Sequence, residues 1–155
     1  MTSGDGPSQE ETVRVSGHSR SVPVVSCDCA VGLVEAARRH VRKNGWSVAV
    51  AVVDPWGAVV ASGRMDRVPP AVLEFATDKT YTEALGESGK AFFERVSSSD
   101  ELTLGLQTRP RLGAWEGGQP IHEGDQLMGV IGVSGAVGPE DSACATAALT
   151  SLGLN

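Results

Sequence analysis

The sequence has no long hydrophobic run, few aromatic residues and no excess of positive charge. Its longest purely apolar stretch, residues 48–53, ends at Asp54 and is far shorter than the roughly 20 residues of a membrane-spanning helix. With 13 Lys and Arg against 19 Asp and Glu, the formal net charge is −6, so the protein as a whole repels nucleic acids. We therefore predict a soluble protein that binds neither membranes nor nucleic acids.

Cysteine is also scarce, and the three that occur, Cys27, Cys29 and Cys144, cannot all pair with one another. Residues 1–21 are polar and contain no hydrophobic segment typical of a secretory signal peptide, so free thiols and a cytoplasmic location are expected. A structural zinc site needs four ligands, and nothing near Cys27 and Cys29 completes such a set. No metal site is predicted.

The length of 155 residues suits one domain with a single core. Residues 1–21 hold few apolar side chains that could offset the entropy cost of ordering, which predicts a flexible polar tail. The folded domain is expected to occupy residues 22–155.

Hydrophobic periodicity predicts a helix and then a hairpin in the first half of this domain. Ser26 is a good N-cap, apolar or small residues recur behind it at helical spacing, and Asn-Gly at 44–45 is a typical stop signal. Two short apolar runs, 47–53 and 58–61, then flank the sequence DPWG at 54–57. That sequence favours a type I turn between antiparallel strands.

The second half of the chain shows the same kinds of signal. In chain order they predict a helix from about residue 70 to 86, a short helix at 91–96, a loop at 97–100 with irregular chain to about 112, a hairpin at 119–133 and a helix at 138–152. Two hairpins separated by helices predict an α+β fold with an antiparallel sheet.

Six short segments of the sequence occur together in a recognisable order. They are residues 48–54 with Gly57, Arg64-Met65-Asp66, residues 76–79 with Tyr81-Thr82, residues 117–121, residues 129–135 and Glu140-Asp141. As a set they resemble the GlcG/HbpS family of haem-degrading domains, which includes a haem-binding protein and the C-terminal domain of PduO-type corrinoid adenosyltransferases. The resemblance implies a single domain with a sheet of about five strands flanked by helices, and assembly into homo-oligomers.

Arg64, Met65 and Asp66 directly follow the second predicted strand, and we predict that all three contact a ligand. Arginine offers a planar fork for a carboxylate or phosphate, and methionine offers an adaptable apolar wall. The alternative is an ion pair between Arg64 and Asp66, or a contact between subunits.

Lys79 lies beside the apolar face of a predicted helix, so its ammonium either reaches solvent or is partly desolvated in a pocket. A desolvated lysine can act as a base or as a Schiff-base nucleophile. The alternative is an ion pair or a charge partner for a ligand. The family resemblance at this position implies a side chain that faces the ligand.

Glycines punctuate the end of the last predicted strand. Gly132 and Gly135 leave room for close backbone approach, and Ser134 precedes a helix N-terminus, where backbone N–H groups favour anions. A tight connection from strand to helix would require the same glycines without a ligand. Together with Arg64 and Lys79, these three residues predict a pocket that prefers anions.

His122 is the histidine that falls among the matched segments, and Glu116 and Glu123 lie near it in sequence. This makes His122 a candidate general acid or base. The alternative is a solvated side chain on a short strand. His18 and His40 have no partners at metal-ligand spacing.

These residues favour a small-molecule-binding domain, and the resemblance implies haem or another anionic tetrapyrrole as the ligand. A competing hypothesis is a cofactor-independent enzyme that uses Lys79 or His122 for proton transfer on a small carbonyl or carboxylate compound. A third is an oligomerising accessory to another protein. Haem iron needs an axial ligand, and Met65 or Thr82 would serve poorly, so we predict weak haem binding without a strong histidine signature.

Overall fold

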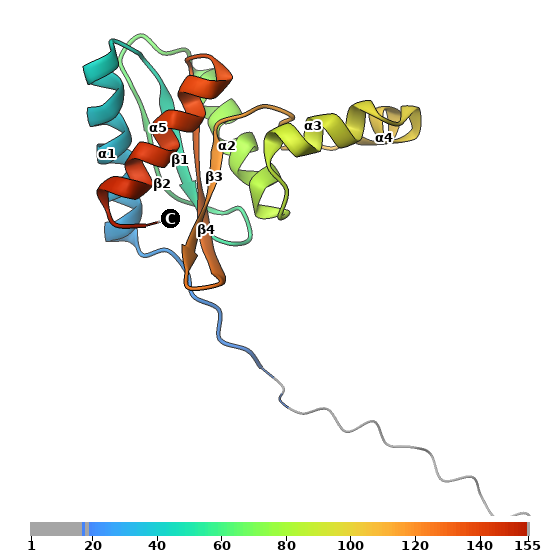
Figure 1. Cartoon of the computed structure of the whole chain (residues 1–155), viewed down its shortest axis with the longest axis horizontal. Coiled ribbons are helices and arrows are strands. Elements are labelled where there is room, and N and C mark those ends of the chain that lie inside the picture. Colours follow the sequence, from blue (N-terminus) through green and yellow to red (C-terminus); the bar gives the residue numbers. More distant parts are fainter. Residues whose placement is uncertain (1–16, 18, 155) are drawn as a thin grey trace, which may run out of the picture.

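Five helices and four strands make up the part of the chain that the computed structural model describes, residues 17 and 19–154 (Figure 1). They are α1 (Cys27–Asn44), β1 (Ala49–Val53), β2 (Val59–Arg64), α2 (Pro70–Ala84), α3 (Gly89–Ser97), α4 (Asp100–Leu106), β3 (Gly118–Glu123), β4 (Gln126–Ser134) and α5 (Gly138–Ser151). Residues 1–16 and His18, most of the tail expected at 1–21, lie outside the described residues.

The strands form one antiparallel sheet in the order β2-β1-β4-β3. This confirms the α+β class, and the described residues contribute four strands where the family resemblance implied about five. β2 and β3 are the two edges, so the sheet joins the two predicted hairpins through their inner strands β1 and β4.

Helices cover both faces of the sheet (Figure 1). α1 and α5 lie side by side on one face, and α2 lies on the other. Because side chains alternate along a strand, Val50 and Val52 of β1 enter the core under α1 and α5, whereas Ala49 and Ala51 face α2. The small alanines therefore leave room for a close approach of α2.

Gly132 of β4 makes the same close approach possible. A Cβ atom at this position would lie 2.2 Å from the Ala76 carbonyl oxygen of α2 and 2.6 Å from the Thr80 methyl group. The packing of helix on sheet thus accounts for this glycine without any ligand.

The ends of α1 follow the sequence signals closely, which confirms the first predicted helix. The Ser26 hydroxyl accepts a hydrogen bond from the Cys29 N–H at 3.2 Å, and Gly45 ends the helix with a left-handed φ of 71°. Neither α1 nor any other described helix combines the length and hydropathy needed to span a membrane.

Both predicted hairpins are confirmed. In the first, the Asp54 carboxylate accepts hydrogen bonds from the Trp56 and Ala58 N–H groups, each at 2.9 Å, and Gly57 takes a φ of 84°. The second hairpin turns at Gly124 and pairs β3 with β4. The turn residues that the sequence singled out therefore close both hairpins.

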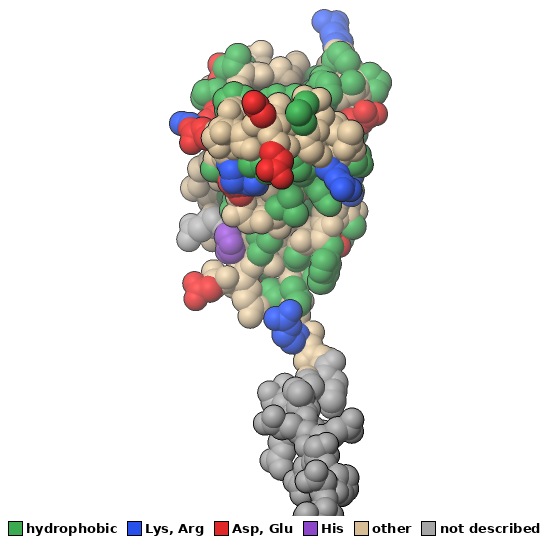
Figure 2. Space-filling view, turned by 90° about the vertical axis from the view of Figure 1, so that its right-hand side faces the viewer, with side chains coloured by type: hydrophobic (Ala, Val, Ile, Leu, Met, Phe, Trp, Pro, Cys, Tyr) green, Lys and Arg blue, Asp and Glu red, His purple; other side chains and the backbone are tan. Residues whose placement is uncertain are grey.

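The stretch expected to be irregular between 97 and 112 contains a helix, so this prediction was wrong. Ser99 caps α4 by accepting from the Leu102 N–H at 3.3 Å, and Asp100 and Glu101 lie in its first turn. The polar cluster is a helix start rather than a loop. α3 and α4 point away from the sheet as an arm (Figure 1), and hydrophobic side chains are exposed among charged ones on that side of the molecule (Figure 2).

Candidate functional site

A buried ion pair links α2 to α5 beside the end of the sheet. The Lys79 Nζ donates to the Asp141 Oδ2 at 2.8 Å and to the Val133 carbonyl oxygen at 2.9 Å, and both side chains are almost fully buried. The second Asp141 oxygen accepts from the Ala136 N–H at 3.0 Å. Asp141 therefore ties the turn between β4 and α5 to helix α2.

Gly117 provides the space for this ammonium. Its φ is 124°, and a Cβ atom there would lie 2.9 Å from the Lys79 Nζ and 2.5 Å from the Val133 carbonyl oxygen. A side chain at residue 117 would thus displace the Lys79 ammonium, which binds the Asp141 carboxylate.

The ion pair lies in the wall of a hollow of about 540 Å³, which we call the aromatic pocket. Its other wall is formed by Phe75, Phe93 and Trp115, and the Phe75 and Trp115 rings meet edge to face with centroids 5.6 Å apart. These three side chains are 40%, 54% and 53% exposed. Large aromatic surface left open beside a buried polar pair is typical of a site for a flat organic molecule.

Of the predicted ligand contacts, Lys79 and Ser134 line the aromatic pocket. Glu116 lines it as well, with its carboxylate near the start of α5. Lys79 is therefore both a pocket residue and half of an ion pair, which are two of the alternatives that the sequence left open.

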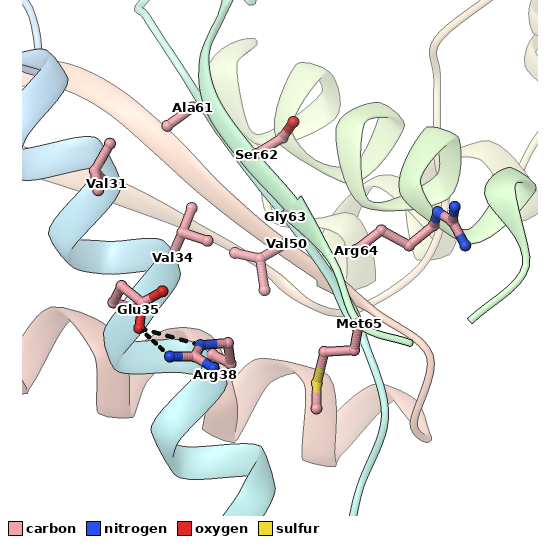
Figure 3. A pocket seen from close by; sticks show the side chains of 10 residues that line it. All are labelled: Val31, Val34, Glu35, Arg38, Val50, Ala61, Ser62, Gly63, Arg64 and Met65. Atoms are coloured by element: carbon pink, nitrogen blue, oxygen red, sulfur yellow. Dashed lines mark hydrogen bonds and ion pairs between the residues drawn. The ribbon is translucent and has the colours of Figure 1, made fainter. Parts of the chain in front are cut away.

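Arg64 and Met65 lie elsewhere, along a hollow of about 280 Å³ between α1 and β2 (Figure 3). Met65 points toward the helices that cover this face, whereas the Arg64 side chain points away from α1 and donates to the Val68 carbonyl oxygen. At the rim, hydrogen bonds from Arg38 hold the pKa of Glu35 below its ordinary value. Arg64 does not pair with Asp66, which is exposed in the following turn.

His122 lines a third hollow, beside the C-terminal end of α2, together with Glu83. Lys79 and His122 therefore face different spaces, and the two cannot act together on one small substrate. Gly135 has a φ of 129°, and a Cβ there would lie 2.7 Å from the Ser47 carbonyl oxygen, so chain packing requires this glycine. The structure thus distributes the predicted site residues over several places.

The sequence interpretation did not assign roles to the aromatic wall, to Asp141 as the partner of Lys79, or to Glu83. The sequence does contain one signal that relates Glu83 to Lys79. Lys79 and Glu83 are four residues apart on one helix, so they share a face, and Gly117-Gly118 offers two adjacent positions without side chains. A Cβ at Gly118 would lie 2.3 Å from the Glu83 Cγ, so this glycine pair accommodates both charged side chains.

The aromatic pocket suits part of what haem requires. The aromatic wall can contact a flat macrocycle, but no histidine, methionine or cysteine is among the described residues that line it. Thr82 is fully buried and accepts from the Gly113 N–H at 2.8 Å, so its hydroxyl is not free. The described residues also include no group of three or more His, Cys, Asp or Glu side chains that could hold a metal ion.

Comparisons with known proteins agree with this fold. Residues 25–150 match the family model described as haem degrading protein HbpS-like. Protein GlcG of Escherichia coli K12 is 33% identical over 111 residues, which cover 72% of this chain and 81% of GlcG.

Solved structures of other proteins show the same fold. Klebsiella pneumoniae protein ORFY superposes with a TM-score of 0.82 at 22% identity, over 90% of this chain and 98% of ORFY. A PduOC–haem complex superposes with a TM-score of 0.77 at 21% identity, over 85% of this chain and 97% of PduOC. The family model matches most of the length of the chain, and GlcG is a relative of the chain at 33% identity. The chain therefore belongs to the HbpS-like family.

Proposed function

We propose that the aromatic pocket binds a flat organic molecule, and that haem or another tetrapyrrole is its ligand. The observation that carries this proposal is that the partly exposed side chains of Phe75, Phe93 and Trp115 line the same hollow as the buried Lys79–Asp141 pair. The haem complex of the PduOC neighbour supports a tetrapyrrole as the flat molecule.

Polar groups at the edge of the pocket would orient such a ligand. The Lys79 ammonium has three N–H donors and uses two of them within the protein, so one remains for a ligand carboxylate. Ser134 supplies a hydroxyl in the same pocket. These groups would receive the acidic side chains of a tetrapyrrole while its ring contacts the aromatic wall.

Titration with haemin, followed through the Soret band, tests this proposal. We expect weak binding without the absorption pattern of a histidine-ligated iron, because neither His40 nor His122 lines the pocket. Trp115→Ala should weaken binding about fivefold, since a lost aromatic contact is worth roughly 1 kcal/mol.

Trp56→Ala is the matched control, because Trp56 is 65% exposed in the β1–β2 turn and does not line the pocket. It should bind haemin as the parent does. A sharp one-to-one Soret shift that His122→Ala abolishes would contradict the proposal and indicate a haem site in the third hollow.

We also propose that the chain forms homo-oligomers. Leu85 and Leu104 do not line the aromatic pocket and are 61% and 68% exposed, and exposed apolar side chains of this size usually contact a partner. Light scattering at micromolar concentration should give a mass of two or more chains. A monomer under these conditions would refute the proposal.

A cytoplasmic location fits the three thiols, and we propose it on that basis. The structure contains no disulfide among Cys27, Cys29 and Cys144, and burial raises the pKa of Cys144 to about 12 and that of Cys29 above its ordinary value. Thiols with raised pKa values are poor nucleophiles and remain reduced in a reducing compartment.

A further inference from the structure

The third hollow, about 420 Å³ in volume, lies between the C-terminal end of α2 and the β3–β4 hairpin. It shares no lining residue with the aromatic pocket. Its walls combine polar and apolar side chains, chiefly those of Glu83, Ser88, Gln119, Pro120, His122 and Leu127. The hollow is thus a separate site, and the function proposed above does not use it.

Glu83 is the most deeply buried charged group in this wall, with 9% of its surface exposed. Its Oε1 accepts from the Gly89 N–H at 3.0 Å, and its Cγ lies where a Cβ at Gly118 would be. The Oε2 has no hydrogen-bond partner among the described residues, yet it is not sealed from solvent. Because Glu83 lines the hollow, this exposed oxygen is the one available to a ligand there.

No cation of the described chain compensates this carboxylate. The charged or titratable side chains on the elements around it are Glu74, Asp78, Lys79 and Tyr81 on α2, Lys90, Glu94 and Arg95 on α3 with Glu87 just before that helix, and His122 and Glu123 on β3. Lys79 is bound to Asp141, Arg95 is bound to Glu87, and none of the described cations forms an ion pair with Glu83. Burial accordingly raises the pKa of Glu83 to about 7.

We propose that this hollow binds a small organic cation, such as a primary ammonium, whose N–H groups donate to the Glu83 Oε2. The side-chain oxygen of Gln119 and an imidazole nitrogen of His122 would accept further hydrogen bonds. Pro120 and Leu127 would contact the aliphatic part of the ligand. A cation is favoured over an anion because the hollow holds a carboxylate without a counter-charge and no fixed positive group.

Calorimetric titration of the full chain with n-butylammonium and ethanolammonium chloride tests the proposal. Binding needs the ionised carboxylate, so affinity should be about tenfold higher at pH 8 than at pH 6. Near pH 7, binding should also release protons, which is measured by repeating the titration in buffers of different ionisation enthalpy. Glu83→Gln should abolish binding at both pH values.

Glu87→Gln is the control, because Glu87 pairs with Arg95 and does not line the hollow. It should bind both amines as the parent does. The proposal is overturned if neither amine binds at millimolar concentration, if Glu83→Gln binds them unchanged, or if acetate binds instead and more tightly at lower pH. Circular dichroism of Glu83→Gln establishes that a loss of binding does not come from unfolding.

Discussion

Replacing Lys79 with methionine should lower the free energy of unfolding by about 3–5 kcal/mol. The substitution leaves the Asp141 carboxylate, 2% exposed, without its cation, and leaves the Val133 carbonyl oxygen without the Lys79 donor. Urea unfolding followed by circular dichroism measures the change through the shift in the midpoint.

A paired replacement separates lost charge balance from lost packing. Lys79→Met with Asp141→Leu removes both charges, so part of the lost stability should return. Recovery should be incomplete, because the Ala136 N–H loses the Asp141 oxygen that it now binds. If Lys79→Met alone unfolds at the parent's urea concentration, the ion pair does not stabilise the junction of α2 and α5.

The stability of the protein should fall between pH 5 and pH 8 because of Glu83. An unperturbed glutamate carboxyl, as in the unfolded chain, has a pKa of 4.5, whereas the pKa of Glu83 is about 7 in the folded protein. Between these two pH values the folded state therefore holds more protons than the unfolded state. The stabilisation by the protonated form is complete below pH 4.5 and is lost as the pH rises through 7. Glu83→Gln should remove this loss and stabilise the protein by about 1–3 kcal/mol at pH 8 relative to the parent.

Urea midpoints of the two proteins across this pH range provide the measurement. The difference between Glu83→Gln and the parent should grow with pH, while Glu87→Gln should follow a profile parallel to the parent's. Arg95 lowers the pKa of Glu87, so Glu87 titrates below the range examined. A constant difference between Glu83→Gln and the parent would show that Glu83 does not titrate in this range.

Much of the fold could be predicted from sequence because its signals are local. Ser26 and Gly45 bound α1, and the residues at 54–57 form the turn that the sequence favours. The first turn of α4 was missed because Ser99, Asp100 and Glu101 occur in loops and in helix caps alike. Without an apolar stripe behind it, such a cluster does not distinguish the two.

The site was less predictable because its members meet through tertiary packing. Lys79 was identified as a pocket residue, but its partner Asp141 lies 62 residues away on another helix. Arg64 and Ser134 are both register partners of Ala49 on the strands either side of β1, yet they line different hollows. The position of a residue at a strand end therefore predicts where it lies in the sheet, and it does not predict which hollow the residue lines.

A ligand that lies against the aromatic wall must quench the fluorescence of Trp115. The chain has two other tryptophans, and Trp46→Phe with Trp56→Phe leaves Trp115 as the single reporter. Titrating this variant with haemin should quench the emission and saturate with one ligand per chain. The matched variant that keeps only Trp56 should show weaker quenching that saturates at the same ligand ratio, because energy transfer to haem weakens with distance and Trp56 lies in the β1–β2 turn, outside the aromatic pocket. Saturable quenching of Trp56 with Trp115 unaffected would contradict the assignment of the aromatic pocket as the ligand site.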